Sequence, residues 1–209
     1  MELDPLILSR IQFAFVVSFH AIFPVFTIGL ASYIALLNGL YFANGNPAWE
    51  RLATFWTKVF AVVFGMGAVS GIVMSFQFGT NWSNFAQASA NFLGPMLSYE
   101  VVTAFFLEAG FLGVLLFGRG KVPQGVHLFA ATMVAVGTFI SAFWILSANS
   151  WMQTPAGVEL IDGAFHVTSW STAIFNASFW YRFMHMATAS FLTGGFVVAA
   201  VSAYYLLRG

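Results

Sequence analysis

The chain has 209 residues, of which 60% are hydrophobic and 7% are charged, and its formal net charge is zero. Because a soluble domain carries about 25% charged residues, this composition indicates an integral membrane protein. The balanced charge gives no sign of a nucleic-acid or acidic partner. The sequence contains no cysteine, which excludes disulfides, thiol catalysis and cysteine-ligated metals.

Five long apolar runs predict an all-α, polytopic membrane helical bundle. The runs are continuous rather than alternating, which favours helices over a β-barrel. We expect one transmembrane domain over residues 1–209, with short links except for an ordered external loop at Ser150–Phe179. In chain order, the predicted spans are about Ile11–Tyr41, Thr54–Phe78, Pro95–Phe117, Val126–Asn149 and Trp180–Leu207.

The distribution of Lys and Arg predicts that the N-terminus lies outside, because cytoplasmic loops of membrane proteins are enriched in these residues. In that orientation, five basic residues lie on the cytoplasmic side and two lie on the outer side. The cytoplasmic set is Arg51, Lys58, Arg119, Lys121 and Arg208, and the outer set is Arg10 and Arg182.

The third span carries two carboxylates, Glu100 and Glu108, in the run LSYEVVTAFFLEAGFLGVLLF. A lipid-exposed carboxylate at the bilayer centre costs about 2.5 kcal/mol or more, so both should face the protein interior, a bound cation or a water path. On a straight helix they would stand about 80° apart around the axis and about 12 Å apart along it. This pair favours a functional intramembrane site over one carboxylate near the headgroups and one routine polar pair.

His20 is the only ionisable side chain in the interior of the first span. Pro24 follows four residues later and has no N–H, so the carbonyl of His20 loses its helical donor and the helix should open or kink. A neutral imidazole is a common ligand of metals and of haem iron. The alternative is a histidine that is hydrogen-bonded to a neighbouring helix.

His185 lies near the outer end of the fifth span, with Arg182 one turn before it on the same side. An axial imidazole with an arginine nearer the water could hold a haem iron and a propionate together. The alternative is an interfacial histidine beside an arginine that extends to the headgroups. His20, Glu100 and His185 are expected at one depth, which favours a site open toward the outside.

Other polar residues have simpler interpretations. Lys58 extends to the inner headgroups, or else lies at the mouth of a proton path from the cytoplasm. His127 and His166 are interpreted as solvated interfacial residues. Ser141 could add hydrogen bonds to a water chain or bond back to its own helix. The glycines of FGMGAVSGIVM in the second span predict close helix packing, with approach of a cofactor plane as the alternative.

The sequence contains no glycine-rich phosphate loop, HExxH motif or nucleophile elbow, so neither hydrolysis nor phosphoryl transfer is indicated. Histidines on helices together with buried carboxylates instead indicate haem binding, proton movement or both. Two classes of function therefore stay open at this point. One is a haem protein, and the other is a proton-coupled transporter or channel without haem.

Several motifs together resemble subunit I of the cytochrome bd-type quinol oxidases. They are SRIQFAFVVSFHAIFP, FQFGTNW, the two glutamates eight residues apart, SANSWMQTPAG and RFMH, and they occur in the family's order along the whole chain. The segment Gln153–Pro155 reads QTP instead of QNP, which resembles the cyanide-insensitive branch.

The resemblance implies a role for individual residues. His20 matches the histidine that ligates one of two high-spin haems, without deciding between haem d and the high-spin haem b. His185 matches an axial ligand of the low-spin haem b. Glu100 matches the carboxylate at the high-spin haem iron, and Glu108 matches the one tied to proton delivery. Lys58 matches a lysine proposed near the start of a proton path. Arg10 and Arg182 are implied partners of haem propionates.

The chain also departs from the family pattern. Ala109 replaces a serine that follows the second glutamate in some members, which removes a hydroxyl from the proton path. Ala177 replaces a proline that some members have after Asn176. In the family, subunit I continues with further helices, a quinol-binding loop and additional haem ligands. We therefore expect the 209 residues alone not to complete all three haem sites.

The resemblance implies a terminal oxidase in the bacterial cytoplasmic (inner) membrane. It would oxidise membrane quinol and reduce oxygen to water, with protons taken up from the cytoplasm past Glu108. The implied cofactors are a low-spin haem b, a high-spin haem b and haem d. Subunit II is the implied partner, and a small single-helix subunit is a further candidate.

Overall fold

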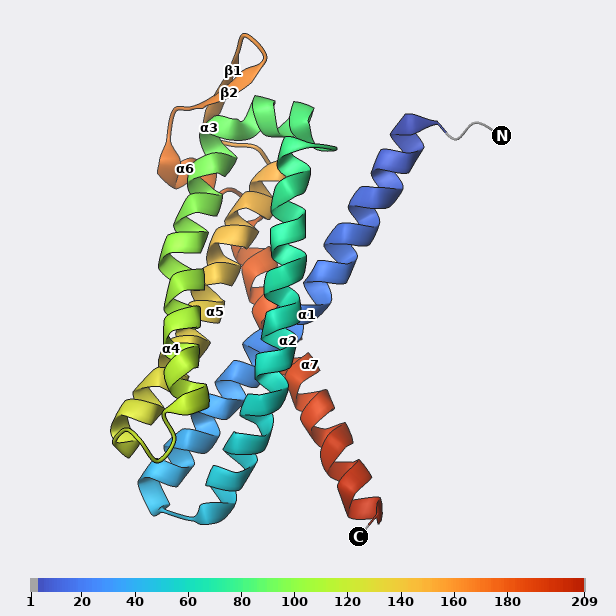
Figure 1. Cartoon of the computed structure of the whole chain (residues 1–209). Coiled ribbons are helices and arrows are strands. Elements are labelled where there is room, and N and C mark those ends of the chain that lie inside the picture. The colour runs from blue at the N-terminus through green and yellow to red at the C-terminus, as the bar shows by residue number, and fades with distance from the viewer. Residues whose placement is uncertain (1–3, 209) are drawn as a thin grey trace.

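The computed structural model describes residues 4–208, and five of its helices are long and apolar enough to cross a membrane (Figure 1). This confirms the predicted helical bundle of five spans, to which the structure adds one small hairpin. The spans are α1 (Pro5–Asn44), α2 (Pro47–Gly79), α3 (Ser83–Glu100) continued through the π-helix η1 (Val101–Phe105) into α4 (Phe106–Phe117), α5 (Gln124–Gln153) and α7 (Phe179–Arg208).

A tight turn makes α1 and α2 antiparallel neighbours. Gly45 ends α1 with a left-handed φ of 65°, which suits a residue without Cβ, and its N–H donates to the carbonyl of Tyr41. Asn46 caps α2 by accepting from the N–H of Ala48. Pro47 occupies the first helical position, where its missing N–H leaves no bond unmade.

The third span begins earlier than predicted, since α3 starts at Ser83 rather than near Pro95. The first part of α3 lies across the upper end of the bundle, and the chain then turns downward (Figure 1). Pro95 lies inside the helix and has no N–H for the carbonyl of Asn91, which permits a bend there. The sequence pattern missed the crosswise part because it has the polar composition of a loop.

The link between α5 and α7 is ordered, as predicted. It contains an antiparallel hairpin of β1 (Val158–Ile161) and β2 (Ala164–Val167), followed by the short helix α6 (Trp170–Ile174). Asp162 and Gly163 have φ values of 49° and 81°, the conformation of a tight two-residue hairpin turn.

An aromatic contact holds the hairpin on the bundle. Trp151 at the end of α5 is buried, and its ring centroid lies 4.5 Å from that of Phe92 and 5.3 Å from that of Phe165. The side-chain amide of Asn91 also donates to the carbonyl of Phe165 at 3.0 Å. The crosswise part of α3 is therefore the base on which the hairpin lies.

Buried apolar side chains form two clusters. The larger one joins α1, α2, α4 and α5, and the smaller one lies beneath the hairpin and joins α3, α5 and α6. Large apolar side chains are also exposed along α1, α2 and α7, as expected for helices that face lipid or further membrane segments. The larger cluster includes Leu30, Ile34, Leu37, Trp56, Phe60, Leu112, Leu115 and Val134, and the smaller one Phe92, Leu93, Met96, Ala148, Trp151 and Ala173.

α1 and α7 make a close contact through small residues. A Cβ on Gly29 would meet the backbone carbonyl oxygen of Ser190, and a Cβ on Gly194 would lie 3.1 Å from the backbone of Gly29. Small residues at a crossing allow two helix backbones to approach, which is a common means of association in membranes. Away from this contact the two helices diverge (Figure 1).

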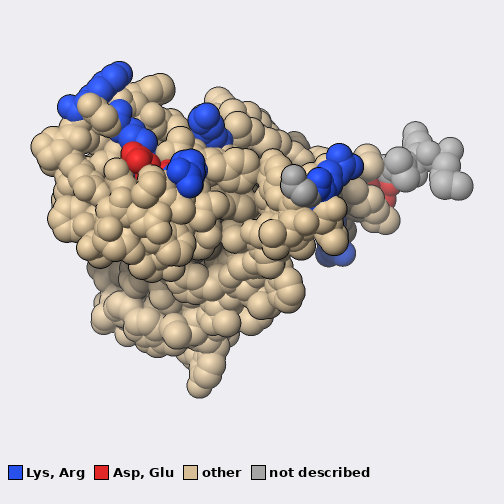
Figure 2. All heavy atoms as spheres, turned by 90° about the horizontal axis from the view of Figure 1, so that it is seen from below, with Lys and Arg blue, Asp and Glu red and all other residues tan. Residues whose placement is uncertain are grey.

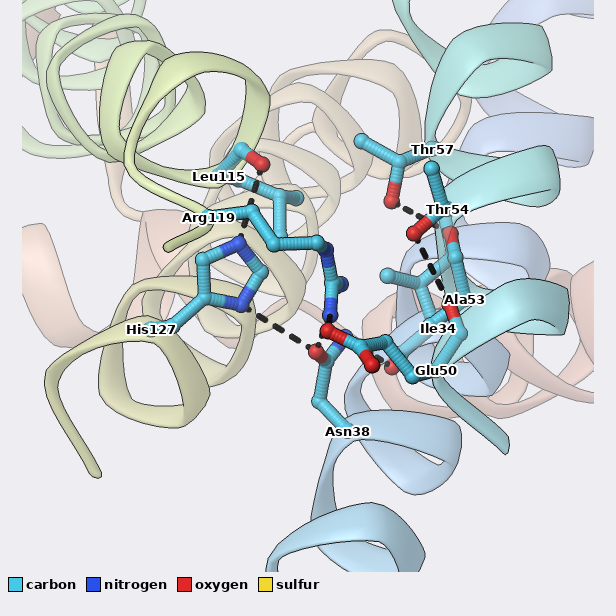
Figure 3. Close-up of polar contacts among 9 residues, drawn as sticks. All are labelled: Ile34, Asn38, Glu50, Ala53, Thr54, Thr57, Leu115, Arg119 and His127. Atoms are coloured by element: carbon cyan, nitrogen blue, oxygen red, sulfur yellow. Dashed lines mark hydrogen bonds and ion pairs between the residues drawn. The ribbon is translucent and has the colours of Figure 1, made fainter. Parts of the chain in front are cut away.

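A polar cluster joins four helices at the lower end of the bundle (Figure 3). The guanidinium of Arg119 lies 3.3 Å from a carboxylate oxygen of Glu50 and donates to Oδ1 of Asn38 at 3.1 Å. Nδ1 of His127 lies 3.1 Å from the same Oδ1, and Nε2 lies 3.1 Å from the carbonyl of Leu115. The amide of Asn38 therefore links α1 to the α4–α5 turn and to α5.

The interpretation of His127 as a solvated interfacial residue is wrong, because its side chain is buried and lies between two acceptors. The sequence places it near the end of a span but cannot show that α1 and α4 close over it. His166, by contrast, is exposed on β2, in agreement with its interpretation.

The basic residues assigned to the cytoplasm gather at one end of the molecule. The links α1–α2 and α4–α5 and the C-terminal end of α7 all lie at the lower end in Figure 1. Figure 2 looks at this end and shows several Lys and Arg side chains around a small acidic spot. The arrangement matches the charge asymmetry seen in the sequence, whereas the side of the membrane that this end faces stays a prediction.

Gly29→Ala should destabilise the protein, because the new methyl group overlaps the carbonyl of Ser190 and forces α1 from α7. Overpacking of this kind costs about 1–3 kcal/mol. Thermal unfolding of the purified complex measures the change. Gly39→Ala on the same helix is the control, since its nearest neighbour would lie 3.9 Å away. Equal midpoints for the two variants would contradict a close α1–α7 contact.

Asn38→Leu should also lower stability, because it leaves Arg119 and His127 without their shared acceptor. Arg119 keeps its ion pair with Glu50, so the cost falls mainly on buried His127, where an unsatisfied polar group costs about 1–3 kcal/mol. Asn44→Leu is the matched control, since Asn44 is exposed and accepts only from the N–H of Asn46 in a local turn. The prediction fails if the denaturant midpoint of Asn38→Leu equals that of the control.

Candidate functional site

The two glutamates of the third span lie on either side of η1 and are both directed at α5. Oε1 of Glu100 accepts a hydrogen bond of 2.8 Å from the hydroxyl of Ser141. Glu108 lies against Gly137, where an added Cβ would meet the Cγ of the glutamate. Ser141 therefore bonds to a site carboxylate and not to its own helix.

Of the predicted site residues, Glu108 is the one that is both buried and has a carboxylate oxygen without a hydrogen-bond partner in the described part of the chain. Its side chain is only 6% exposed, and its Oε1 has no hydrogen-bond partner among residues 4–208. An unpartnered carboxyl group in a membrane interior is costly, and such groups mark proton relays and ion paths. The space opposite it is provided by Gly137, which has no side chain.

His20 is held by α2. Its Nδ1 lies 2.9 Å from the hydroxyl of Ser70, and that hydroxyl donates to the carbonyl of Gly67 at 3.0 Å. Because the hydroxyl proton is assigned to the carbonyl of Gly67, we assign Nδ1 as the donor in its contact with Ser70. The imidazole then keeps an unprotonated Nε2, the form in which histidine binds iron. In the described part of the chain no hydrogen bond engages Nε2.

The glycine-rich face of α2 packs closely on α1, as the sequence predicts. A Cβ on Gly67 would lie 3.2 Å from Cβ of Phe23, and a Cβ on Gly71 would lie 3.2 Å from the ring of His20. The histidine ring thus lies against a bare backbone, which limits its rotation. α1 stays helical through Pro24 up to Asn44, so the helix does not open there, and a kink at Pro24 stays a prediction.

His185 is exposed on α7 in this chain. The neighbouring Arg182 donates to Oδ1 of Asn149 at 3.0 Å and so ties the start of α7 to the end of α5. The structure brings neither residue into contact with His20 or with the glutamates. An exposed imidazole suits a ligand that lies between this chain and another membrane segment.

The remaining predicted residues lie on the surface. Arg10 is exposed near the start of α1. Lys58 is exposed on the lower part of α2 and lines a shallow hollow with Glu50, Arg51 and Thr54. The hollow is open to the surroundings at the basic end of the molecule.

These residues fit haem ligation better than a compact metal centre. Within residues 4–208, no three His, Asp or Glu side chains converge in a way that could hold a bare metal ion. Haem iron needs only one or two axial side chains from the protein. His20 meets that requirement, with Nδ1 fixed by Ser70 and Nε2 available.

Reasoning from the sequence missed several residues that position the site. Ser70 supports His20 across fifty residues of sequence, and no local pattern distinguishes it from Ser75, the other serine of α2. The hydroxyl of Thr103 accepts from the indole N–H of Trp144 at 2.9 Å, within η1 between the two glutamates. In the sequence, Thr103 lies among apolar β-branched and aromatic residues and would be interpreted as a packing residue. Its hydrogen bond to Trp144 is visible only in the structure.

The motif SANSWMQTPAG forms a polar network at the upper end. The amide of buried Asn176 donates to the hydroxyl of Ser150 at 2.8 Å and accepts from the hydroxyl of Thr154 at 2.8 Å. Thr154 is the middle residue of the QTP segment, and its hydroxyl also lies 2.8 Å from that of Ser178. This network fixes the entry of the chain into α7, and it does so without a proline at position 177.

The chain matches the family model described as "Cytochrome bd terminal oxidase subunit I" over residues 8–209. It is 37% identical over 206 residues to the cytochrome bd ubiquinol oxidase subunit 1 of Bacillus subtilis (strain 168), covering 99% of this chain and 44% of the relative. It is 38% identical over 208 residues to the cytochrome bd-II ubiquinol oxidase subunit 1 of Escherichia coli (strain K12), covering 99% of this chain and 40% of the relative.

The fold is also similar to a solved structure. The structure of bd oxidase from Geobacillus thermodenitrificans superposes with a TM-score of 0.91 at 30% identity, covering 97% of this chain and 47% of that one. The chain therefore spans less than half the length of these relatives. Its five apolar helices and these bacterial relatives place it in the bacterial inner membrane as a multi-pass protein. The family model, the relatives and the fold agree, and the chain belongs to the family of cytochrome bd terminal oxidase subunit I.

Proposed function

We propose that this chain forms the N-terminal, haem-bearing part of a respiratory terminal oxidase that oxidises membrane quinol and reduces oxygen to water. The observation that supports it most directly is the state of His20, whose Nδ1 is committed to Ser70 while Nε2 stays available to iron. The relatives named as ubiquinol oxidase subunits support the choice of reaction.

His20 would ligate a high-spin haem, and Glu100 would provide the carboxylate near its iron. His185 would be an axial ligand of a low-spin haem b, which fits its exposed position on α7. Arg10 and Arg182 would bind propionates. Bound haem, as two haems b and a haem d, would supply the iron that carries electrons and binds oxygen.

Glu108 and Glu100 would deliver protons to the site of oxygen reduction. Glu108 is buried beside Gly137, and Glu100 is held by the hydroxyl of Ser141 at 2.8 Å. The alanine that follows Glu108 has no hydroxyl, so water would replace a serine there. Lys58 is exposed at the basic end, which would face the cytoplasm and receive protons. The N-terminus would then lie outside.

The remaining parts of the enzyme would come from membrane segments in contact with the apolar faces of this chain. Large apolar side chains are exposed on the upper part of α1 and the lower part of α7, among them Phe15, Ile22 and Leu206. Subunit II, and a small single-helix subunit as a further candidate, would complete the assembly.

His185→Ala should remove the low-spin haem signal from the complete enzyme, because the iron loses an axial ligand. The reduced-minus-oxidised visible spectrum of the purified complex measures this. His166→Ala, on the exposed β2 strand, is the matched control and should leave the spectrum unchanged. An unaltered low-spin band in His185→Ala would refute the ligand assignment. A colourless wild-type complex that conducts protons would support a transporter instead.

Glu108→Gln should slow quinol-dependent oxygen consumption by about 10²-fold or more, since an amide cannot transfer the proton that a positioned carboxyl group relays. The substitution preserves size and adds no group that Gly137 cannot accommodate. Glu159→Gln, exposed on β1, is the control and should keep wild-type turnover. Wild-type turnover by Glu108→Gln at full haem content would leave Glu108 as a structural residue.

A further inference from the structure

The helix between the two glutamates is not a regular α-helix. Residues Val101–Phe105 form the π-helix η1, and the N–H of Phe106 donates to the carbonyl of Val101, five residues earlier. An α-helix would make this bond over four residues. A short π-helix within a longer α-helix contains one extra residue, and such insertions are frequent at functional sites.

The extra residue changes the angle between the glutamates. Eight regular residues from Glu100 to Glu108 turn about 800°, which leaves the side chains about 80° apart. If one residue is taken up by the π turn, the remaining seven steps turn about 700°, which is within about 20° of two full turns. The π turn therefore brings both carboxylates onto nearly the same face of the span.

The contacts of the span agree with this angle. Glu100 bonds to Ser141 and Glu108 lies against Gly137, and these two residues are one turn apart on the same side of α5. The opposite side of the span is turned outward, since Val102 is 64% exposed and Phe106 is 63% exposed. The span thus presents its acidic face to the protein and its apolar face to the surroundings.

A side-chain clasp holds the π turn against α5. The hydroxyl of Thr103 donates to the carbonyl of Tyr99 at 2.6 Å and accepts from the indole N–H of Trp144 at 2.9 Å. The ring of Tyr99 stacks on that of Trp144, with centroids 5.3 Å apart and an interplanar angle of 19°. In the π turn the backbone hydrogen bonds span five residues instead of four, and the Thr103 hydroxyl supplies an additional donor to the carbonyl of Tyr99. The indole N–H of Trp144 bonds to the same hydroxyl from α5 and so holds Thr103 in place.

We propose that the π turn sets the rotational phase of Glu100 and Glu108, and that Thr103 and Trp144 are positioning residues that maintain it. The consequence for proton delivery rests on the proposed function, whereas the geometric claim does not. Proton transfer between the two carboxyl groups, directly or through water, requires both to open toward the same space. Thr103 and Trp144 maintain this shared orientation of the carboxyl groups without contacting either of them.

Crosslinking between introduced cysteines tests this rotational phase, and residues 1–209 contain no cysteine of their own. The pairs Glu100→Cys with Ser141→Cys and Glu108→Cys with Gly137→Cys should both be joined by a short bifunctional methanethiosulfonate reagent in the assembled complex, since the Glu100–Ser141 contact spans a long side chain. Deletion of Val102 should preserve both crosslinks, since the glutamate positions become seven regular residues apart. Insertion of one alanine after Val102 is the control and should abolish one of them. Loss of either crosslink on deletion of Val102 would overturn the proposal.

Thr103→Val tests the clasp without changing chain length. It keeps the shape of the side chain and removes the hydroxyl, so the yield of the 100–141 crosslink should fall severalfold relative to the 108–137 crosslink. Thr103→Ser should restore it, because the hydroxyl returns. Equal yields in Thr103→Val and wild type would refute a positioning role. If the crosslinks behave as expected while Glu108→Gln retains full oxygen consumption, the proton-delivery role of Glu108 fails and the geometric inference stands.

Discussion

The structure depends on accommodating two carboxyl groups within an apolar helix. Each would be costly against lipid, so the span must turn both toward protein. Ser141 supplies a donor to Glu100, and Gly137 leaves room for Glu108. α5 is therefore packed against the third span along its acidic face, and α1 packs on α5, α2 and α7.

The two ends of the bundle are stabilised by different means. At the lower end, Asn38 joins α1 to Arg119 and His127 in a buried polar cluster. At the upper end, Asn176 and the residues around Thr154 fix the chain where it enters α7. Both clusters satisfy buried donors and acceptors and link helices that are far apart in the sequence.

Within the same scaffold, the two histidines have different surroundings. His20 is oriented by Ser70 from a neighbouring helix, and a fixed Nδ1 donor is a common way to prepare Nε2 for a metal. His185 is exposed on a helix whose start is tied to α5 by Arg182.

The sequence by itself determined the membrane class, the five spans and the candidate residues, because hydrophobic length and rare intramembrane charges are local properties. It could not show that His127 is buried, that α3 begins at Ser83 or that Ser70 supports His20, since each depends on a distant segment. The angle between Glu100 and Glu108 also came from tertiary structure. A regular period predicts about 80°, and only the structure reveals the π turn η1, whose extra residue turns the two side chains toward the same face of the span.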